Sequence, residues 1–264
     1  MPYGNLHGII SPMTLATLHI TTYNIHKGFS QFNRSLMVHE LREQLRSLNP
    51  DLVFLQEVQG LHERHAHRHP RWPGQPQHEF LADDLWHNAY AQNAVYDHGH
   101  HGNAILSRFP ILASRNQDVT HLRFEKRGLL HCTVRPEGWE QDLHCVCSHL
   151  SLFGASRRWQ MDALARDLEE LIPGDAPLII AGDFNDWRNQ AHTHLAERLG
   201  LREAFAGNAG RPTRSFPAAL PLMRLDRIYV RGFTIEHTEV HRGPGWARIS
   251  DHAALSAHLR PLPA

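Results

Sequence analysis

The sequence predicts an α/β fold in which two mixed β-sheets are flanked by helices. Two passages of the chain, residues 15–56 and 143–182, each show a strand, a helix and a strand in that order. Such passages are typical of parallel strands that are joined by a helix on the outside of a sheet. Consecutive strands between and after these passages bring the number of strands above what one small sheet holds.

The first passage begins with residues 15–25, which alternate in polarity and are rich in β-branched side chains, as is typical of a strand. Residues 34–48 then place apolar side chains at helical spacing, and an Asn-Pro pair ends the helix. Residues 51–56 are almost entirely apolar. We therefore predict a buried strand there that ends at Glu57.

The second passage repeats this order with a strand at residues 143–150, an apolar helical stripe at 161–171 and an apolar strand at 177–182. Pro173 and the glycine after it end the helix. The remaining predicted strands cover residues 102–107, 111–119, 128–135, 225–231, 233–241 and 252–259.

Length and charge limit the architecture and the partners. The chain has 264 residues, of which 41% are hydrophobic, so one large core is expected. No linker rich in Gly, Ser or Pro divides it, and we predict a single domain over residues 15–264 after a disordered leader at 1–14, with Met1 and Met13 as alternative starts. The 27 basic and 27 acidic residues balance, which argues against avid binding to duplex nucleic acid.

The sequence also predicts a cytoplasmic, monomeric protein. No apolar run approaches the ~18 residues of a membrane span, and the N-terminus lacks a secretory pattern. The three cysteines, Cys132, Cys145 and Cys147, cannot all pair with one another. Two of them lie in one predicted strand, which favours buried thiols over a disulfide framework.

Histidine is abundant, with 23 residues, and several of these gather at residues 62–70. A Trp-Pro-Gly sequence follows, so we predict a solvated loop. The alternative is a histidine-rich protein that binds soft metals through residues 62–69. Metal sites need fixed geometry, which a proline-rich loop rarely supplies.

Polar side chains gather where the predicted strands end or begin. This set comprises Asn24, Glu57, His149, Asp183, Asn185, Asp226, Asp251 and His252. Several carboxylates beside a core are costly unless something neutralises them. Carboxylate and amide oxygens are the ligands that Mg²⁺ and Mn²⁺ prefer, so these residues predict a site for a hard cation. The histidines would then serve in proton transfer or phosphate contact.

Seven ordered motifs carry a resemblance that covers the chain from about residue 17 to 259. They are T-Y-N-I at 22–25, L-Q-E-V at 55–58, G-N-A-I-L-S-R at 102–108, S-H-L at 148–150, G-D-F-N at 182–185, L-D-R-I at 225–228 and S-D-H at 250–252. With them the chain resembles the magnesium-dependent endonuclease/exonuclease/phosphatase family. Its finer pattern is similar to an uncharacterised bacterial branch whose members are sometimes linked to cardiolipin synthesis genes.

The resemblance implies a four-layer, deoxyribonuclease-I-like sandwich with the pocket at one edge. It implies that Glu57 is the principal Mg²⁺ ligand, with Asn24 and Asp251 nearby, and that Mn²⁺ can substitute. It also implies that Asp183 and Asn185 orient the attacking water and hold the phosphate.

The same resemblance assigns the remaining catalytic roles. His252 matches the histidine that contacts the phosphate and acts as general acid or base, and Asp226 matches the carboxylate that orients it. His149 matches a second active-site histidine of the deoxyribonuclease and sphingomyelinase branches. Which group is the base and which the acid stays open.

Four further residues are candidates for substrate binding. Arg127 and Arg157 can make bidentate phosphate contacts, with surface charge or salt bridges as the alternative. Asn103 can reach the substrate or serve as a structural amide. Trp246 can stack on a base or sugar, or pack on its own loop.

The predicted function is magnesium-dependent hydrolysis of phosphodiester bonds, with a nuclease ahead of a lipid or small-molecule phosphodiesterase or phosphatase. His149 and a basic stretch from Arg211 to Arg231 favour nucleic acid, whereas the balanced charge and the link to lipid genes oppose it. A lipid enzyme would make peripheral membrane contact through an exposed apolar rim, for which Phe153 and Trp246 are the candidates. The second alternative, a catalytically silent binding module, requires a missing site residue, and none is missing.

Overall fold

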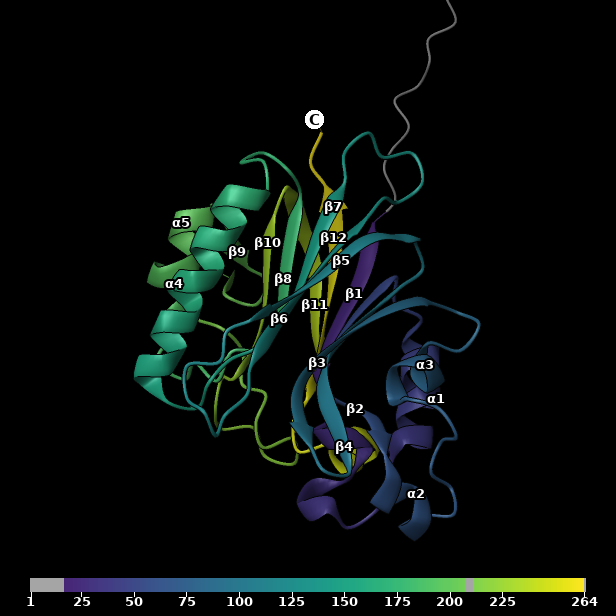
Figure 1. Cartoon of the computed structure of the whole chain (residues 1–264). Coiled ribbons are helices and arrows are strands. Elements are labelled where there is room, and N and C mark those ends of the chain that lie inside the picture. Colours follow the sequence, from purple (N-terminus) through teal and green to yellow (C-terminus); the bar gives the residue numbers. More distant parts are fainter. Residues whose placement is uncertain (1–16, 208–210, 264) are drawn as a thin grey trace, which may run out of the picture.

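Two six-stranded sheets with helices on their outer faces form the fold (Figure 1). The computed structural model describes residues 17–207 and 211–263. The leader predicted at residues 1–14 lies outside them. This architecture confirms the predicted four-layer sandwich of mixed sheets.

The first sheet has the order β11-β12-β1-β2-β4-β3. These strands span Phe233–His241 (β11), Ala254–Pro261 (β12), Leu18–Asn24 (β1), Leu52–His62 (β2), Gly99–Ser107 (β4) and His87–Tyr96 (β3). β1 and β2 are parallel and are joined by α1 (Val38–Leu48), as the first passage predicts. The buried side chains Val38, Leu41 and Leu45 form the apolar stripe of this helix.

The second sheet has the order β5-β6-β7-β8-β10-β9. These strands span Ile111–Asp118 (β5), Gly128–Val134 (β6), Leu143–His149 (β7), Leu178–Asp183 (β8), Asp226–Arg231 (β10) and Arg202–Glu203 (β9). β7 and β8 are parallel and are joined by α4 (Gly154–Leu171). Met161, Leu164 and Leu168 are buried on this helix, which confirms the second passage.

The inner faces of the two sheets meet in one apolar core. Ile20, Phe54 and Leu255 from the first sheet pack in one cluster with Ile179 and Ile228 from the second. Because every strand alternates its side chains between faces, each sheet fills this core with one face and packs its helices with the other.

The histidine-rich segment is not the loop that its composition predicts. β2 continues to His62, and α2 (Glu63–Arg68) follows it directly. The His62 imidazole accepts a hydrogen bond from the His65 backbone N–H at 3.2 Å, which caps the helix. The His65 ring also stacks on Trp72, 5.2 Å away between centroids, so aromatic packing orders the segment.

One edge strand and several short elements have too weak a pattern to be predicted. They are β3, β9, α3 (Gln77–Ala82), α5 (Glu197–Leu199), α6 (Pro244–Ile249) and three single turns at His26–Gly28, Gln31–Asn33 and His192–Ala196. β3 is a largely exposed edge strand, so it lacks the apolar alternation of a buried one.

Two further expectations concern the cysteines and the membrane. Cys132, Cys145 and Cys147 are free and buried, as expected. Within residues 17–207 and 211–263, no helix combines the length and the apolar character that crossing a bilayer requires.

Candidate active site

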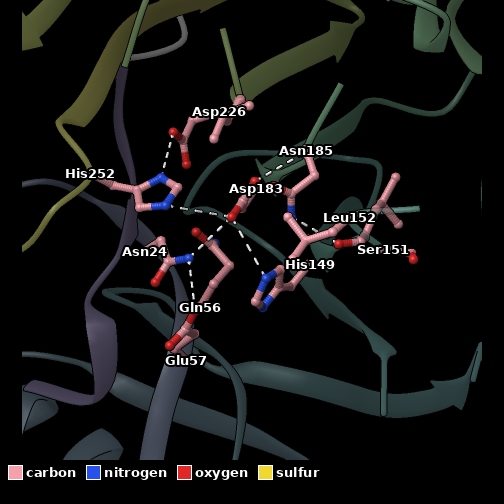
Figure 2. Close-up of polar contacts among 12 residues, drawn as sticks. Asn24, Gln56, Glu57, His149, Ser151, Leu152, Asp183, Asn185, Asp226 and His252 are labelled. Carbon is pink, nitrogen blue, oxygen red and sulfur yellow. Dashed lines mark hydrogen bonds and ion pairs between the residues drawn. The ribbon is translucent and has the colours of Figure 1, made fainter. Parts of the chain in front are cut away.

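The predicted catalytic side chains converge at one end of the sandwich (Figure 2). Asn24 ends β1, His149 ends β7 and Asp183 ends β8, while Asp226 begins β10. β7 and β8 pair in parallel with His149 opposite Asp183. The sheet pairing therefore places these two side chains next to each other.

Asp183 is the centre of the site, and it is 2% exposed. Its Oδ2 accepts a hydrogen bond from the Asn24 side-chain amide at 3.1 Å, and its Oδ1 accepts one from the Asn185 backbone N–H at 2.9 Å. The Nε2 atoms of His149 and His252 lie 3.6 Å and 3.8 Å from Oδ2. Both histidines thus face the same carboxylate oxygen, as Figure 2 shows.

Glu57 reaches the site through an irregularity in β2. The strand does not end at this residue, which corrects the prediction. The register between β2 and β4 shifts between Leu55 and Val58, and Glu57 has a φ of 56°. A non-glycine residue rarely adopts this conformation, and strain of this kind is found at functional sites. The bulge brings the Glu57 carboxylate within 3.4 Å of the Asn24 amide nitrogen.

The neighbours of Glu57 are positively charged. The Lys27 ammonium lies 3.2 Å from its Oε2. Burial on its own raises the pKa of the Glu57 carboxyl, but nearby basic groups, above all the Lys27 ammonium, outweigh burial and hold the pKa well below its usual range. Glu57 is therefore a carboxylate at neutral pH.

His252 and Asp226 form a buried pair. The His252 Nδ1 lies 2.9 Å from the Asp226 Oδ2. Burial lowers the pKa of His252, but the Asp226 and Asp183 carboxylates outweigh it and raise the pKa to about 10. At neutral pH His252 is an imidazolium whose Nδ1–H donates to Asp226 and whose Nε2 side faces Asp183.

The pKa values of Asp183 and His149 shift in the direction that disfavours the charged form of each group. Burial raises the pKa of Asp183 to about 6, and Asp226 adds to this while His252 opposes it. Burial, together with the charge of Arg127, holds the pKa of His149 well below its usual range. At neutral pH the site therefore contains an ionised Asp183 between a charged and a neutral imidazole.

Asn185 and Asp251 complete the predicted set. Asn185 has a φ of 49°, and its side-chain amide donates to the Leu150 carbonyl at 3.0 Å. The Asp251 Oδ1 lies 3.4 Å from the His26 Nδ1. The neighbouring Ser250 hydroxyl donates to the Asn24 carbonyl at 2.7 Å, which ties the last motif to the first.

A pocket of about 190 Å³ opens onto these side chains. Glu57, His149, Asp183, Asn185 and His252 line its polar part, and Arg127 lies at its edge. Arg127 also pairs with Glu125 at 3.1 Å, so both interpretations of this arginine agree with the structure.

Trp187 lines the same pocket, and sequence reasoning missed it. The side chain is 45% exposed, and its ring lies 4.7 Å from the guanidinium carbon of Arg157. The signal was present in the motif G-D-F-N-D-W, where a tryptophan follows the polar loop directly.

Three predicted substrate-binding residues do not line the pocket. Arg157 is 1% exposed, and its guanidinium donates to the Ser151 and Leu152 carbonyls, so it supports the loop after β7. Asn103 is buried and donates to the Gly128 carbonyl at 2.8 Å, as the structural-amide alternative requires. Trp246 packs against Tyr23 and His241.

The basic stretch from Arg211 to Arg231 does not form one surface. Arg224 donates to the Pro212 carbonyl, Arg227 is fully buried, and Arg231 donates to carbonyls near the opposite end of β10. Side chains of one strand alternate in direction and spread along its length, which the linear sequence does not reveal. Arg211 and Arg214 remain exposed.

The donor chemistry of the site fits a divalent cation. Ligand atoms of Asp183, Asp226 and His252 lie within 4.8 Å of one another. Among residues 17–207 and 211–263 no other group of three His, Cys, Asp or Glu residues meets this criterion, the histidine-rich segment included. A metal-binding imidazole must be neutral, and the Asp226 and Asp183 carboxylates disfavour that form by raising the pKa of His252. The carboxylate and amide oxygens of the site are donors of the kind that hard divalent cations prefer.

Comparison with known proteins places this geometry among related chains. A family model described as "Endonuclease/Exonuclease/phosphatase family" matches residues 21–252. The uncharacterized protein YbhP of Escherichia coli K12 is 46% identical over 241 residues, which cover 91% of this chain and 95% of YbhP.

Solved structures share the fold at low sequence identity. An endonuclease/exonuclease/phosphatase from Beutenbergia cavernae has a TM-score of 0.72 at 20% identity, covering 93% of this chain and 72% of that one. The human Nocturnin catalytic domain with bound sulfate has a TM-score of 0.71 at 20% identity, covering 94% and 96%. TDP2 of D. rerio complexed with a single-strand DNA product has a TM-score of 0.66 at 20% identity, covering 92% and 99%.

Proposed function

The chain belongs to the endonuclease/exonuclease/phosphatase family, and from this premise we propose that it hydrolyses phosphodiester bonds with the help of Mg²⁺, for which Mn²⁺ can substitute. One observation carries the proposal. Asp183 lies buried at the pocket, with its Oδ2 3.6 Å from the Nε2 of His149 and 3.8 Å from the Nε2 of His252. A candidate proton acceptor, the Asp183 Oδ2, and a candidate proton donor, the His252 Nε2, thus lie 3.8 Å apart.

Asp183 is the proposed general base. As a water molecule attacks phosphorus, one of its protons passes to the Asp183 carboxylate while the bond from phosphorus to the leaving oxygen breaks. The Asn185 backbone N–H holds the other oxygen of Asp183, which fixes the direction of this carboxylate. A positioned base contributes on the order of 10² to 10⁴ in rate.

His252 is the proposed acid. An imidazolium in the pocket donates a hydrogen bond to a phosphoryl oxygen and can give its proton to the leaving oxygen. Asp226 maintains the charged form by accepting from Nδ1. Because the Asp226 and Asp183 carboxylates raise the pKa of His252 and favour its charged form, we assign His252 the role of acid and Asp183 the role of base.

The cation would be held by Glu57, with Asn24 and Asp251 nearby. When bound, Mg²⁺ supplies charge stabilisation to the non-bridging phosphoryl oxygens. The chain contributes the strained backbone that turns Glu57 into the pocket and the Asn24 amide that connects it to Asp183.

The substrate class has two candidates. Nucleic acid is the expectation from His149, and a relative by fold, TDP2, has been solved with single-strand DNA. The basic stretch no longer supports it, because only part of that stretch is exposed. A membrane phospholipid is the second candidate, and exposed apolar side chains beside the pocket favour it.

Hydrolysis of bis-p-nitrophenyl phosphate, a soluble diester, tests the proposed reaction. We expect activity with Mg²⁺ or Mn²⁺, loss of activity in chelator and recovery after the cation is restored. Glu57→Gln should require at least about tenfold more Mg²⁺ for half-maximal rate, since one charged oxygen is removed while the shape is kept. Glu140→Gln, an exposed glutamate, is the matched control. Full activity in chelator would contradict the proposal.

A further inference from the structure

Two groups of exposed apolar side chains flank the candidate active site. The first, here the Phe tip, consists of Phe124, Leu152 and Phe153, which are 77%, 55% and 50% exposed. The rings of Phe124 and Phe153 contact each other edge to face, with 5.8 Å between centroids. The Glu125 carboxylate accepts from the Leu152 backbone N–H at 3.1 Å, which joins the two loops that form this tip.

The second group, here the Leu tip, consists of Leu220, Leu222 and Met223, which are 67%, 58% and 39% exposed. They lie on a turn closed by a hydrogen bond from the Met223 N–H to the Phe216 carbonyl at 2.8 Å. The base of this turn touches the site, since the Phe216 ring lies 4.9 Å from the ring of His252.

The pocket lies between the two tips. Leu152 from the Phe tip and Met223 from the Leu tip both line it, together with Trp187. Single exposed apolar residues are normal, but an exposed apolar group on each side of a catalytic pocket indicates an interaction surface.

Unpaired positive charges accompany the tips. Five exposed basic residues lie in these loops or in segments next to the pocket, and none of them forms an ion pair within residues 17–207 and 211–263: Arg123 and Lys126 flank Phe124, Arg158 lies near the start of α4, Arg188 follows Trp187, and Arg214 precedes the Leu tip. The acids of these loops, Glu125 and Asp186, are turned inward: Glu125 pairs with Arg127, and Asp186 is fully buried. Apart from the carboxylates of the site itself, the unpaired exposed charges around the pocket are therefore positive.

Several acidic residues lie at the opposite end of the sandwich. The loop between β6 and β7 carries exposed Glu137 and Glu140 together with Asp142, and the loop before β8 carries exposed Asp175. In Figure 1 the chain end marked C lies at this opposite end. Asp142 pairs with the exposed Arg135 at 2.7 Å, whereas Glu137, Glu140 and Asp175 form no ion pair within residues 17–207 and 211–263.

We propose that the two tips and the surrounding arginines and lysine dock on an anionic phospholipid bilayer, which presents the phosphodiesters of its headgroups to the pocket. Apolar side chains insert at the interface while basic side chains are attracted to anionic lipid. Nucleic acid fits less well, because bases stack on aromatic rings and the Leu tip offers them none. The choice of substrate rests on the proposed function, but docking itself requires no turnover.

Vesicle flotation tests the docking surface. The probes are vesicles of phosphatidylcholine alone and vesicles with about one third phosphatidylglycerol. We expect the protein to bind the anionic vesicles at least about tenfold more tightly. A variant with Phe153→Ser, Leu220→Ser and Leu222→Ser should lose at least about tenfold in binding to them, because three inserted apolar side chains are removed.

Matched controls separate docking from folding and from catalysis. Leu112→Ser with Leu262→Ser removes two exposed leucines that lie away from the tips, and this variant should bind like the native chain. Hydrolysis of bis-p-nitrophenyl phosphate should be unchanged in both variants, since that substrate is soluble. If the native chain hydrolyses the soluble diester but does not bind vesicles, the docking proposal alone is overturned. If it binds vesicles but does not hydrolyse the diester, the proposed reaction alone is overturned.

Three other results would also overturn the docking proposal. The triple variant could bind the vesicles as well as the native chain does. The native chain could bind single-stranded DNA at these tips and ignore vesicles, which would assign the surface to nucleic acid. Light scattering could show a dimer that the triple variant loses, which would assign the surface to a second copy.

Discussion

The two β–α–β units, β1-α1-β2 and β7-α4-β8, share one topology and deliver different chemistry. In the second unit, both strands end at the site, and the parallel pairing puts His149 directly opposite Asp183. In the first unit, only β1 ends there, and Asn24 pairs with Gln56. Glu57 is one residue further along a strand that continues to His62.

This difference shows how a continuous strand can supply a site residue. In a regular strand, neighbours point to opposite faces, so Gln56 and Glu57 could not both face the second sheet. The Gln56 amide lies 3.2 Å from the Cys147 Sγ of that sheet, and Glu57 lies beside Asn24. The bulge turns Glu57 back toward the side that Gln56 occupies. The second unit needs no such device, because its acid lies in register.

The largest expected effect comes from the second unit. Asp183→Asn should lower kcat by about 10³-fold, because the amide cannot accept the proton from water. Added Mg²⁺ should not restore the rate, whereas it should partly restore Glu57→Gln. Steady-state rates across a Mg²⁺ titration measure both, and circular dichroism checks folding. If added Mg²⁺ restored both variants equally, the assignment of Asp183 to proton transfer and of Glu57 to the cation would be contradicted.

An intermediate effect concerns the pH profile. Asp183 must be ionised, so activity should fall as pH drops through about 6, and His252 must be charged, so activity should fall as pH rises through about 10. Asp226→Asn removes the main cause of the raised pKa of His252. The alkaline limb of kcat/KM should therefore move to lower pH. An unchanged alkaline limb would show that the titration of His252 does not cause it.

The smallest expected effect on activity comes from Trp246, which packs against Tyr23 of the first unit. Trp246→Ser should leave kcat/KM within about twofold, because the ring contacts Tyr23 and His241 and does not line the pocket. The free energy of unfolding should fall by about 1–3 kcal/mol as this packing is lost. Thermal melts and rates on the soluble diester measure the two effects. A large loss of activity with unchanged stability would indicate that Trp246 binds the substrate.

Several parts of the site were accessible from the sequence, because they follow from local order. Polar residues at the ends of apolar strands are visible as a pattern, and for this reason Asn24, His149 and Asp183 could be named in advance. Arg157 and Trp246 could not be interpreted in the same way. Their environments are formed by segments distant in the chain, and the sequence does not say whether a side chain turns toward the pocket or into the protein.

The sequence by itself determined the two parallel units, the ends of β1, β7 and β8, and the identity of the acids and histidines, since periodicity and strand length are local properties. Only the tertiary structure decided how Glu57 turns, which tryptophan borders the pocket and where the unpaired charges gather. These depend on the packing of one sheet against another and on loops that meet at one end of the sandwich. Long-range packing of this kind has no signature within a single stretch of residues.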